Sequence, residues 1–139
     1  MASALIDASA MVAAFAPGQP AAEHYQELLQ LAELDHWSLS TTWPCVVEAS
    51  YLVPAPERFA LLKWLGKQAV AVFPFGQESL LEWVPTMQRY TQAPRTEMDL
   101  ADASLVWLAA DTGVTQVMTM DNRDFSRYRL PDGRAFEIL

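Results

Sequence analysis

The chain has 139 residues and a formal net charge of −8 at pH 7, and a domain of this length buries roughly two-thirds of the surface that its unfolded form exposes. Cys45 is the only cysteine, which excludes a disulfide framework and zinc-finger spacings within the chain. The negative charge disfavours unassisted binding of nucleic acid, because that binding relies on lysine and arginine at the phosphates.

Apolar runs of strand length alternate with stretches of helical length along the whole chain. In chain order we expect a strand at 4–6, helices at 8–15 and 20–34, a strand at 36–40, a helix between Thr41 and Pro54, a helix at 57–67, a strand at 69–73, helices at 78–90 and 100–112, and strands at 116–119 and 135–139. Strands separated by helices imply parallel crossovers. The predicted fold is therefore α/β, a three-layer α/β/α sandwich with a mostly parallel sheet of four or five strands, in a single domain over residues 1–139.

Three local signals refine the expected helices. The helix at 20–34 has apolar residues at helical spacing, and we expect these to face the interior: Leu28, Leu31, Ala32 and Leu34. Pro85 predicts a kink or a break in the helix at 78–90, because proline lacks the backbone N–H. Thr96 precedes Asp99 by three residues, a spacing related to a capping box.

Two acidic residues follow apolar strand-like runs, Asp7 after residues 4–6 and Asp121 after residues 116–119. The carboxyl ends of parallel strands line the ligand crevice of an open sheet. Asp7 fits a helix N-cap equally well. Asp124 fits a β-turn and is interpreted as a structural acid or one just behind the site. Whether Asp121 or Asp124 is the last acid of the site stays open.

Three further acids lie in helical stretches. Glu48 sits among apolar neighbours, where a charge needs either solvent or a partner, and we favour a crevice-facing side chain over an exposed one. Asp99 and Asp102 are three residues apart, which places both carboxylates on one side of the first helical turn. The helix dipole alone accounts for either acid. The two together, near other acids, favour a divalent cation.

The candidate ligands are all oxygen atoms, which favours Mg²⁺ or Mn²⁺ over zinc. His24 and His36 are the only histidines, and surface positions are expected for both. Ser9 and Thr119 lie two residues from Asp7 and Asp121, within reach of the site, although capping and strand roles also suffice for them. Cys45 is expected to be a small core residue.

The amino end is apolar but has no basic segment, and Asp7 interrupts it, so a signal peptide is not expected. No stretch reaches the roughly 18 apolar residues of a membrane span, and we expect a cytoplasmic protein. Positive charges gather near the carboxyl end, where Arg123, Arg127 and Arg129 are candidates for contacts with RNA. An apolar fraction of 52% indicates a homodimer.

Four segments together resemble the PIN-domain family of ribonucleases, in particular the VapC-like toxins of type II toxin–antitoxin modules: LIDASAMVAAF, TTWPCVVEASYLV, MDLADASLVWLAADTG and VMTMDNRDF. The resemblance implies an α/β/α fold and an endoribonuclease that depends on Mg²⁺ or Mn²⁺. It also implies a homodimer and a cognate antitoxin whose tail enters the acidic groove. By the same resemblance the catalytic acids are Asp7, Glu48, Asp102 and Asp121, with Asp99 as an additional metal ligand.

The sequence therefore predicts metal-dependent hydrolysis of RNA phosphodiester bonds. A non-catalytic interaction module, whose acids bind a partner's arginines, is the first alternative. An aspartate-based phosphatase is less favoured, because such enzymes need a second acid close to the first and a late lysine. Asp7 is followed by Ala8 and Ser9, and no lysine comes after Lys67.

Overall fold

The computed structural model describes residues 2–92 and 94–139. Within these residues the centre of the molecule is a sheet of five strands in the order β3-β2-β1-β4-β5. Each neighbouring pair of strands is parallel. The strands are β1 (Ser3–Ile6), β2 (Ser38–Thr42), β3 (Ala71–Phe73), β4 (Gln116–Met118) and β5 (Glu137–Ile138).

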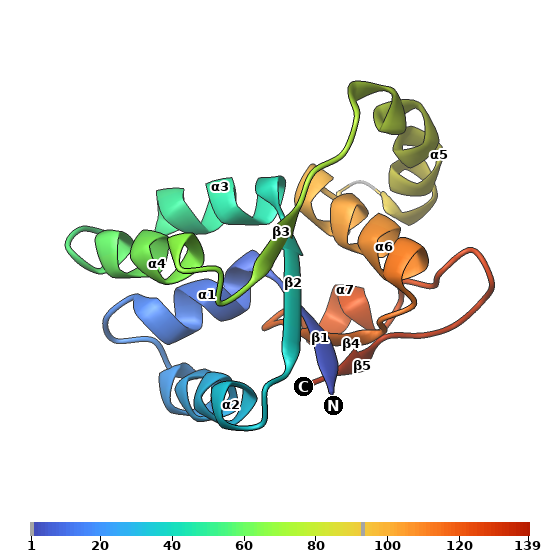
Figure 1. The fold of residues 1–139 in the computed structure, drawn as a ribbon. Coiled ribbons are helices and arrows are strands. Elements are labelled where there is room, and N and C mark those ends of the chain that lie inside the picture. The colour runs from blue at the N-terminus through green and yellow to red at the C-terminus, as the bar shows by residue number, and fades with distance from the viewer. Residues whose placement is uncertain (1, 93) are drawn as a thin grey trace.

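Helices cover both faces of this sheet. They are α1 (Ala8–Phe15), α2 (Ala22–Leu34), α3 (Trp43–Leu52), α4 (Glu57–Gly66), α5 (Leu80–Tyr90), α6 (Leu100–Thr112) and the short α7 (Asn122–Phe125), with a 3-10 helix at Gln77–Ser79 before α5. Figure 1 shows α1 to α4 on one side of the sheet and α5 and α6 on the other. The predicted three-layer α/β/α architecture with a parallel sheet is confirmed.

The order of the strands decides where a site can form. From β1 the chain moves to β2 and β3 on one side, and it later returns to β4 and β5 on the other side. In an open parallel sheet this change of direction leaves a crevice beyond the carboxyl ends of the two strands where it occurs. The ends of β1 and β4 are therefore adjacent, and the residues that follow them meet.

The core lies between the sheet and its helices. α6 is buried at most positions, from Ala101 through Val106 and again at Leu108 and Ala109, because it packs against both α5 and β2. Asp99 caps the start of this helix, and Gly113 ends it in the left-handed conformation with φ of 77°. A residue without a Cβ adopts that conformation with little strain. These two end signals give α6 the boundaries that the sequence predicts.

Two expectations about α2 and the strand that follows were wrong. Leu31 and Leu34 are 45% and 72% exposed, because the buried residues of α2 are Tyr25 and Ala32. The other two expected positions are correct, since Ala32 is buried and Leu28 packs against the core. β2 begins at Ser38 rather than at residue 36. His36 has a φ of 56°, which is a left-handed conformation that a strand does not contain.

Two expectations about α5 and α6 also differ from the structure. Of the kink or break expected at Pro85, the break is absent, because α5 continues from Leu80 to Tyr90. The N-cap of α6 is Asp99, whose side chain accepts a hydrogen bond from the backbone N–H of Asp102, so the capping role expected near Thr96 belongs to Asp99. Asp124, for which the sequence also fitted a β-turn, lies in the single-turn helix α7.

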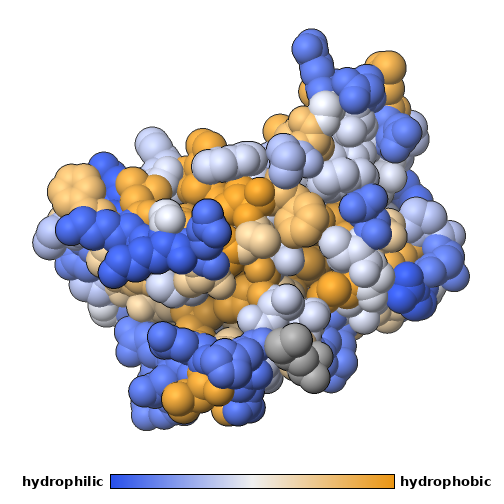
Figure 2. All heavy atoms as spheres, in the orientation of Figure 1, coloured by the Kyte–Doolittle hydropathy of each residue, from blue (hydrophilic) through white to orange (hydrophobic). Residues whose placement is uncertain are grey.

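Apolar residues also reach the surface. Figure 2 shows them gathered between α2 and α4, where a groove of about 680 Å³ is lined by the aromatic rings of Phe15, Trp37 and Trp64 among others. None of the helices within residues 2–92 and 94–139 combines the length and the apolarity that crossing a membrane requires.

Candidate metal centre

A hollow of about 200 Å³ opens where the carboxyl ends of β1 and β4 meet. We call it the acidic crevice, because seven carboxylates line it: Asp7, Glu48, Glu97, Asp99, Asp102, Asp121 and Asp124. The remaining lining residues are Ser9 and Leu52, so none of the described residues that line the crevice is basic. The fold thus brings every acid named from the sequence to one place, and it adds Glu97.

Asp7 occupies the end of β1 and is almost completely buried. One carboxylate oxygen, Oδ1, accepts a hydrogen bond of 2.7 Å from the backbone N–H of Ala8. The other, Oδ2, accepts bonds of 2.8 Å from the hydroxyls of Ser9 and Thr119. Asp7 is therefore the N-cap of α1, and it also faces the crevice, so the two interpretations of this residue are compatible.

Ser9 and Thr119 link Asp7 to the opposite strand. The Ser9 hydroxyl accepts a hydrogen bond from the backbone N–H of Met120, and the Thr119 hydroxyl accepts one from the backbone N–H of Asp121. These bonds fix the chain just after β4 against the start of α1. Both hydroxyls thus hold the carboxylate of Asp7 in place.

Asp102 projects into the crevice from the first turn of α6. Its backbone N–H donates to Asp99 Oδ1 over 2.8 Å, which fixes the main chain at this point. Its carboxylate is mostly buried, and its Oδ2 accepts a hydrogen bond of 2.7 Å from the hydroxyl of Tyr128. Nothing in the sequence marked Tyr128 as part of the site, since its contact with Asp102 depends on the packing of the carboxyl-terminal segment.

Asp121 and Asp124 come from the two ends of one short turn of helix. Asp121 is the N-cap of α7, and its Oδ1 accepts a hydrogen bond of 3.1 Å from the backbone N–H of Asp124. Asp124 Oδ1 forms an ion pair of 2.9 Å with Arg127. The structure thus gives both acids a place at the site, where the sequence left open which of them takes part.

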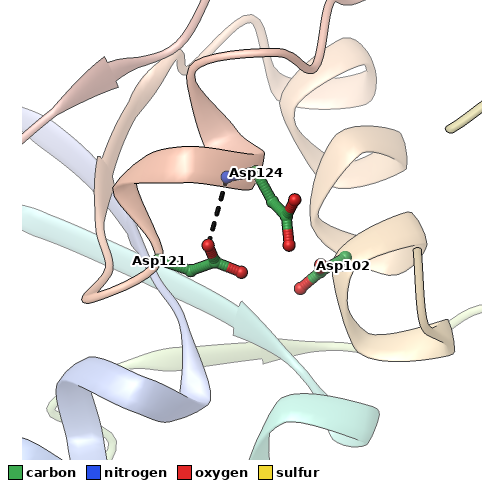
Figure 3. Close-up of side chains that lie close together, drawn as sticks. All are labelled: Asp102, Asp121 and Asp124. Atoms are coloured by element: carbon green, nitrogen blue, oxygen red, sulfur yellow. Dashed lines mark hydrogen bonds between the residues drawn. The ribbon is translucent and has the colours of Figure 1, made fainter. Parts of the chain in front are cut away.

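The carboxylates of Asp102, Asp121 and Asp124 point toward one another (Figure 3). One oxygen from each lies within 4.8 Å of the others. Three carboxylate oxygens at this spacing fit a small divalent cation, because hard cations such as Mg²⁺ and Mn²⁺ take oxygen ligands from carboxylates. The donor set therefore fits the cation that the sequence predicts, with Asp124 in place of Asp7 and Asp99 in the tightest group.

Burial, and to a lesser extent neighbouring negative charge, raises the pKa of several acids in the crevice. Burial, reinforced by the negative charge of Asp99, raises the pKa of Asp102 to about 8, against a smaller opposing effect of the Tyr128 hydrogen bond. Burial likewise raises the pKa of Asp7, although its hydroxyl partners oppose the change. A carboxylate with a raised pKa gains from a nearby cation, because the cation stabilises its ionised form.

Glu48 reaches the same crevice from the middle of α3 and is half-buried. Burial is the main cause that raises its pKa, and the charges of Asp99 and Asp7 add to it. Burial is also the first cause that raises the pKa of Asp121. The exposed Glu97 lies in the loop before α6, and no strand or helix pattern pointed to it.

The arginines near the carboxyl end have different surroundings. The guanidinium of Arg127 donates to Asp124 and to the backbone carbonyl of Tyr90, so it is engaged inside the protein. Arg129 donates to the carbonyls of Ser126 and Tyr128. Arg123 is exposed and makes no ion pair with any residue in the described part of the chain. Arg123 is thus the arginine of this group most available to a ligand.

The residues with softer ligand atoms lie away from the cluster. His24 and His36 are both exposed, as expected for surface histidines. Cys45 is fully buried, and burial raises the pKa of its thiol to about 12, so it stays protonated. The expectation that Cys45 is a core residue is confirmed.

Comparison with known proteins identifies the fold. The structure is similar to that of VapC20 from Mycobacterium tuberculosis, a toxin that cleaves the sarcin–ricin loop, with a TM-score of 0.72 and 13% sequence identity over 87% of this chain and 92% of that chain. No protein-family model and no curated protein matches the sequence. The chain thus has the PIN-like fold that its sequence pattern led us to expect.

Proposed function

We propose that this protein is an endoribonuclease that hydrolyses RNA phosphodiester bonds with the help of Mg²⁺ or Mn²⁺. The observation that carries the proposal is the cluster of Asp102, Asp121 and Asp124, whose carboxylate oxygens lie within 4.8 Å of one another in a crevice lined by four further acids. Such a concentration of negative charge repels a phosphodiester unless a cation is present.

Asp102, Asp121 and Asp124 would hold the cation, and Asp7 and Asp99 would complete its surroundings from the two sides of the crevice. A bound divalent cation supplies positive charge that stabilises the transition state of phosphodiester hydrolysis, and it makes water more acidic. The hydroxyls of Ser9 and Thr119 keep the Asp7 carboxylate turned toward this place. We retain Asp7, Glu48, Asp102 and Asp121 as the catalytic acids.

Glu48 has the properties of a general base. It is half-buried at the edge of the acidic crevice, and its pKa is raised mainly by burial. A carboxylate with a raised pKa accepts a proton from water more readily than an ordinary glutamate does. We infer that Glu48 orients the attacking water and takes its proton.

The substrate has to approach a protein with a net charge of −8. Arg123, which is exposed one residue after the start of α7, is placed to contact a phosphate beside the crevice. Arg127 and Arg129 lie in the same segment and contribute positive charge. VapC20 cleaves the sarcin–ricin loop, so this RNA hairpin belongs among the first substrates to try.

We also propose that the protein is a toxin in the cytoplasm, that it forms a homodimer and that a cognate antitoxin inhibits it. α3 supports the dimer, because Trp43, Val47 and Tyr51 recur every fourth residue and are 53%, 63% and 83% exposed. Exposed apolar surface of this kind is typical of protein interfaces. The negative charge of the neighbouring crevice favours an antitoxin segment with arginine or lysine residues.

Cleavage of a panel of structured RNAs, including the sarcin–ricin loop, tests the proposed function. Each RNA is incubated with the protein in Mg²⁺, in Mn²⁺ and in EDTA, and in parallel with the Asp102→Asn variant. We expect cleavage by the wild type in the two metal solutions only, and none by the variant. If the wild type binds a basic partner but cuts no RNA under any condition, the chain is an interaction module instead.

A further inference from the structure

The hydroxyl of Tyr128 contacts one acid of the metal cluster. It donates to Asp102 Oδ2 over 2.7 Å. The Oδ1 atom of the same carboxylate accepts no hydrogen bond from any residue in the described part of the chain. One oxygen of Asp102 is therefore occupied by the protein, and the other is left for a ligand in the crevice.

The position of the Tyr128 ring is fixed independently of Asp102. The side chain is completely buried. Its ring meets those of Tyr90 and Phe125 edge to face, with centroid separations of 5.1 Å in both cases. Its backbone N–H donates to the carbonyl oxygen of Asp124. Because packing on several sides holds the ring, the hydroxyl is a fixed point to which the Asp102 carboxylate is tied.

The same segment also holds a second acid of the cluster. Arg127, one residue before Tyr128, forms the ion pair with Asp124. The chain that leaves α7 thus touches two of the three clustered carboxylates through adjacent side chains, and it joins the first turn of α6 to the end of α7. Hydrogen-bond partners behind a metal ligand commonly set the ligand's orientation in this way.

We propose that Tyr128 is a positioning residue that orients Asp102 for the divalent cation. The inference rests on the proposed function in so far as that function places a cation at this cluster. Tyr128 touches neither the cation nor the RNA and acts only through the rotamer of Asp102. Without the hydroxyl the carboxylate is free to rotate, and holding it in the binding orientation then costs conformational entropy.

The test compares two tyrosine-to-phenylalanine variants in the same aromatic cluster. Tyr128→Phe removes the hydroxyl that binds Asp102 and keeps the ring. Tyr90→Phe is the matched control, since the Tyr90 hydroxyl accepts a hydrogen bond from the backbone N–H of Arg129 and does not contact an acid. The dissociation constant for Mn²⁺ is measured by isothermal titration calorimetry, and thermal unfolding in EDTA shows whether each variant is folded.

We expect Tyr128→Phe to raise the Mn²⁺ dissociation constant by about 10- to 100-fold, the range usual for partners behind a metal ligand, and Tyr90→Phe to leave it within twofold. In an Asp102→Asn background the Tyr128→Phe change should have no further effect on Mn²⁺ binding. Equal dissociation constants for wild type and Tyr128→Phe, or equal weakening by both phenylalanine variants, would overturn the assignment.

A second measurement uses the wild-type protein and does not depend on the folding of a variant. Tyrosine is labelled with ¹³C at Cζ, and Mg²⁺ is added during NMR. The Tyr128 signal should move more than the Tyr90 signal, because only the Tyr128 hydroxyl is bonded to a cluster acid. Equal movement contradicts the proposal. If the protein binds Mn²⁺ tightly but cleaves no RNA, the proposed function is wrong, and the role of Tyr128 is decided by the dissociation constants alone. If the protein binds no Mn²⁺, both proposals are wrong.

Discussion

The carboxylates on the two sides of the acidic crevice differ in how many hydrogen bonds they accept from the protein. On the β1 side, Asp7 accepts three hydrogen bonds, from Ala8, Ser9 and Thr119. On the α6–α7 side, Asp102, Asp121 and Asp124 direct oxygens toward one another. Each acid of the second side has one protein donor, from Tyr128, the backbone of Asp124 and Arg127 respectively. The negative charge that these single donors leave is available for a cation to balance. Changes to the donors around Asp7 are therefore expected to act mainly on folding. Changes to the clustered acids, or to Asp7 itself, are expected to act mainly on the metal and the reaction.

The largest effect is expected from Asp102→Asn. This change removes one negative charge from the cluster while it keeps the shape of the side chain. We expect RNA cleavage to fall by about a thousandfold, which corresponds to a loss of about 4 kcal/mol of transition-state stabilisation. Cleavage rates under saturating Mg²⁺ measure this. Asp111→Asn, at the exposed far end of the same helix, is the control and should keep full activity.

The pH dependence of the metal-free protein comes next in size. The pKa of Asp102 is about 8 in the folded protein against an ordinary value of 3.8. Between these values the folded state holds a proton that the unfolded state has lost, so the free energy of unfolding falls as pH rises, by a few kcal/mol at most. The raised pKa values of Asp7 and Glu48 act in the same direction.

Urea unfolding in EDTA at pH 5, 6.5 and 8.5 measures this slope. Mg²⁺ should restore stability more at pH 8.5 than at pH 5, because it binds the ionised carboxylates. In Asp102→Asn the free energy of unfolding should depend less on pH. It should also be similar in EDTA and in Mg²⁺. A metal-free protein whose stability stays constant or increases over this range would show that the pKa values of these acids are not raised as described.

A smaller effect, confined to folding, is expected on the β1 side. Thr119→Val removes the hydroxyl that donates to Asp7 and accepts from the backbone N–H of Asp121. The loss of these bonds should lower the free energy of unfolding by about 1–2 kcal/mol. Mn²⁺ affinity should change little, because Ala8 and Ser9 still hold the Asp7 carboxylate. Thr115→Val, just before β4, is the matched control. A large loss of Mn²⁺ affinity in Thr119→Val would contradict the view that the donors on the β1 side act mainly on folding.

The smallest effect concerns the approach of RNA. Arg123→Gln should weaken RNA binding by about 1 kcal/mol or less, as for other exposed charge pairs. It should also reduce the dependence of binding on salt by about 0.7 in the logarithmic slope, the value for one contact to a single strand. Fluorescence anisotropy at several KCl concentrations, with the inactive Asp102→Asn protein as background, gives both quantities. Lys67→Gln removes a charge elsewhere, in the apolar groove, and should change neither.

The fold was predictable where both ends of an element carry local signals. α1 and α6 have the predicted boundaries because Asp7 and Asp99 cap them and Gly113 ends α6. The buried face of α2 was predicted wrongly at Leu31 and Leu34. The leucines of this helix fit more than one possible buried face, and tertiary contacts select the face that contains Tyr25 and Ala32. α7 was missed because four residues are too few to show helical periodicity.

The site was predictable to the extent that acids follow strands or open helices. That rule placed Asp7, Asp99, Asp102 and Asp121 at one crevice before their distances were known. The rule did not predict which acids lie closest together. Asp124 belongs to the tightest cluster because of the helical turn of α7, which the sequence did not reveal. Tyr128 was not foreseen, because its contact with Asp102 depends on packing between segments distant in sequence. Glu97 was not foreseen, because it lies in a loop that no strand or helix pattern marks.

The position of the cation itself tests the central claim most directly. Crystals grown with Mn²⁺ and measured with X-rays near the manganese absorption edge locate the ion by its anomalous scattering. We predict one strong peak between Asp102, Asp121 and Asp124, which disappears in Asp102→Asn. A peak outside the acidic crevice, or no peak in a protein that cleaves RNA with Mn²⁺, would contradict the assignment of these three acids as the metal centre.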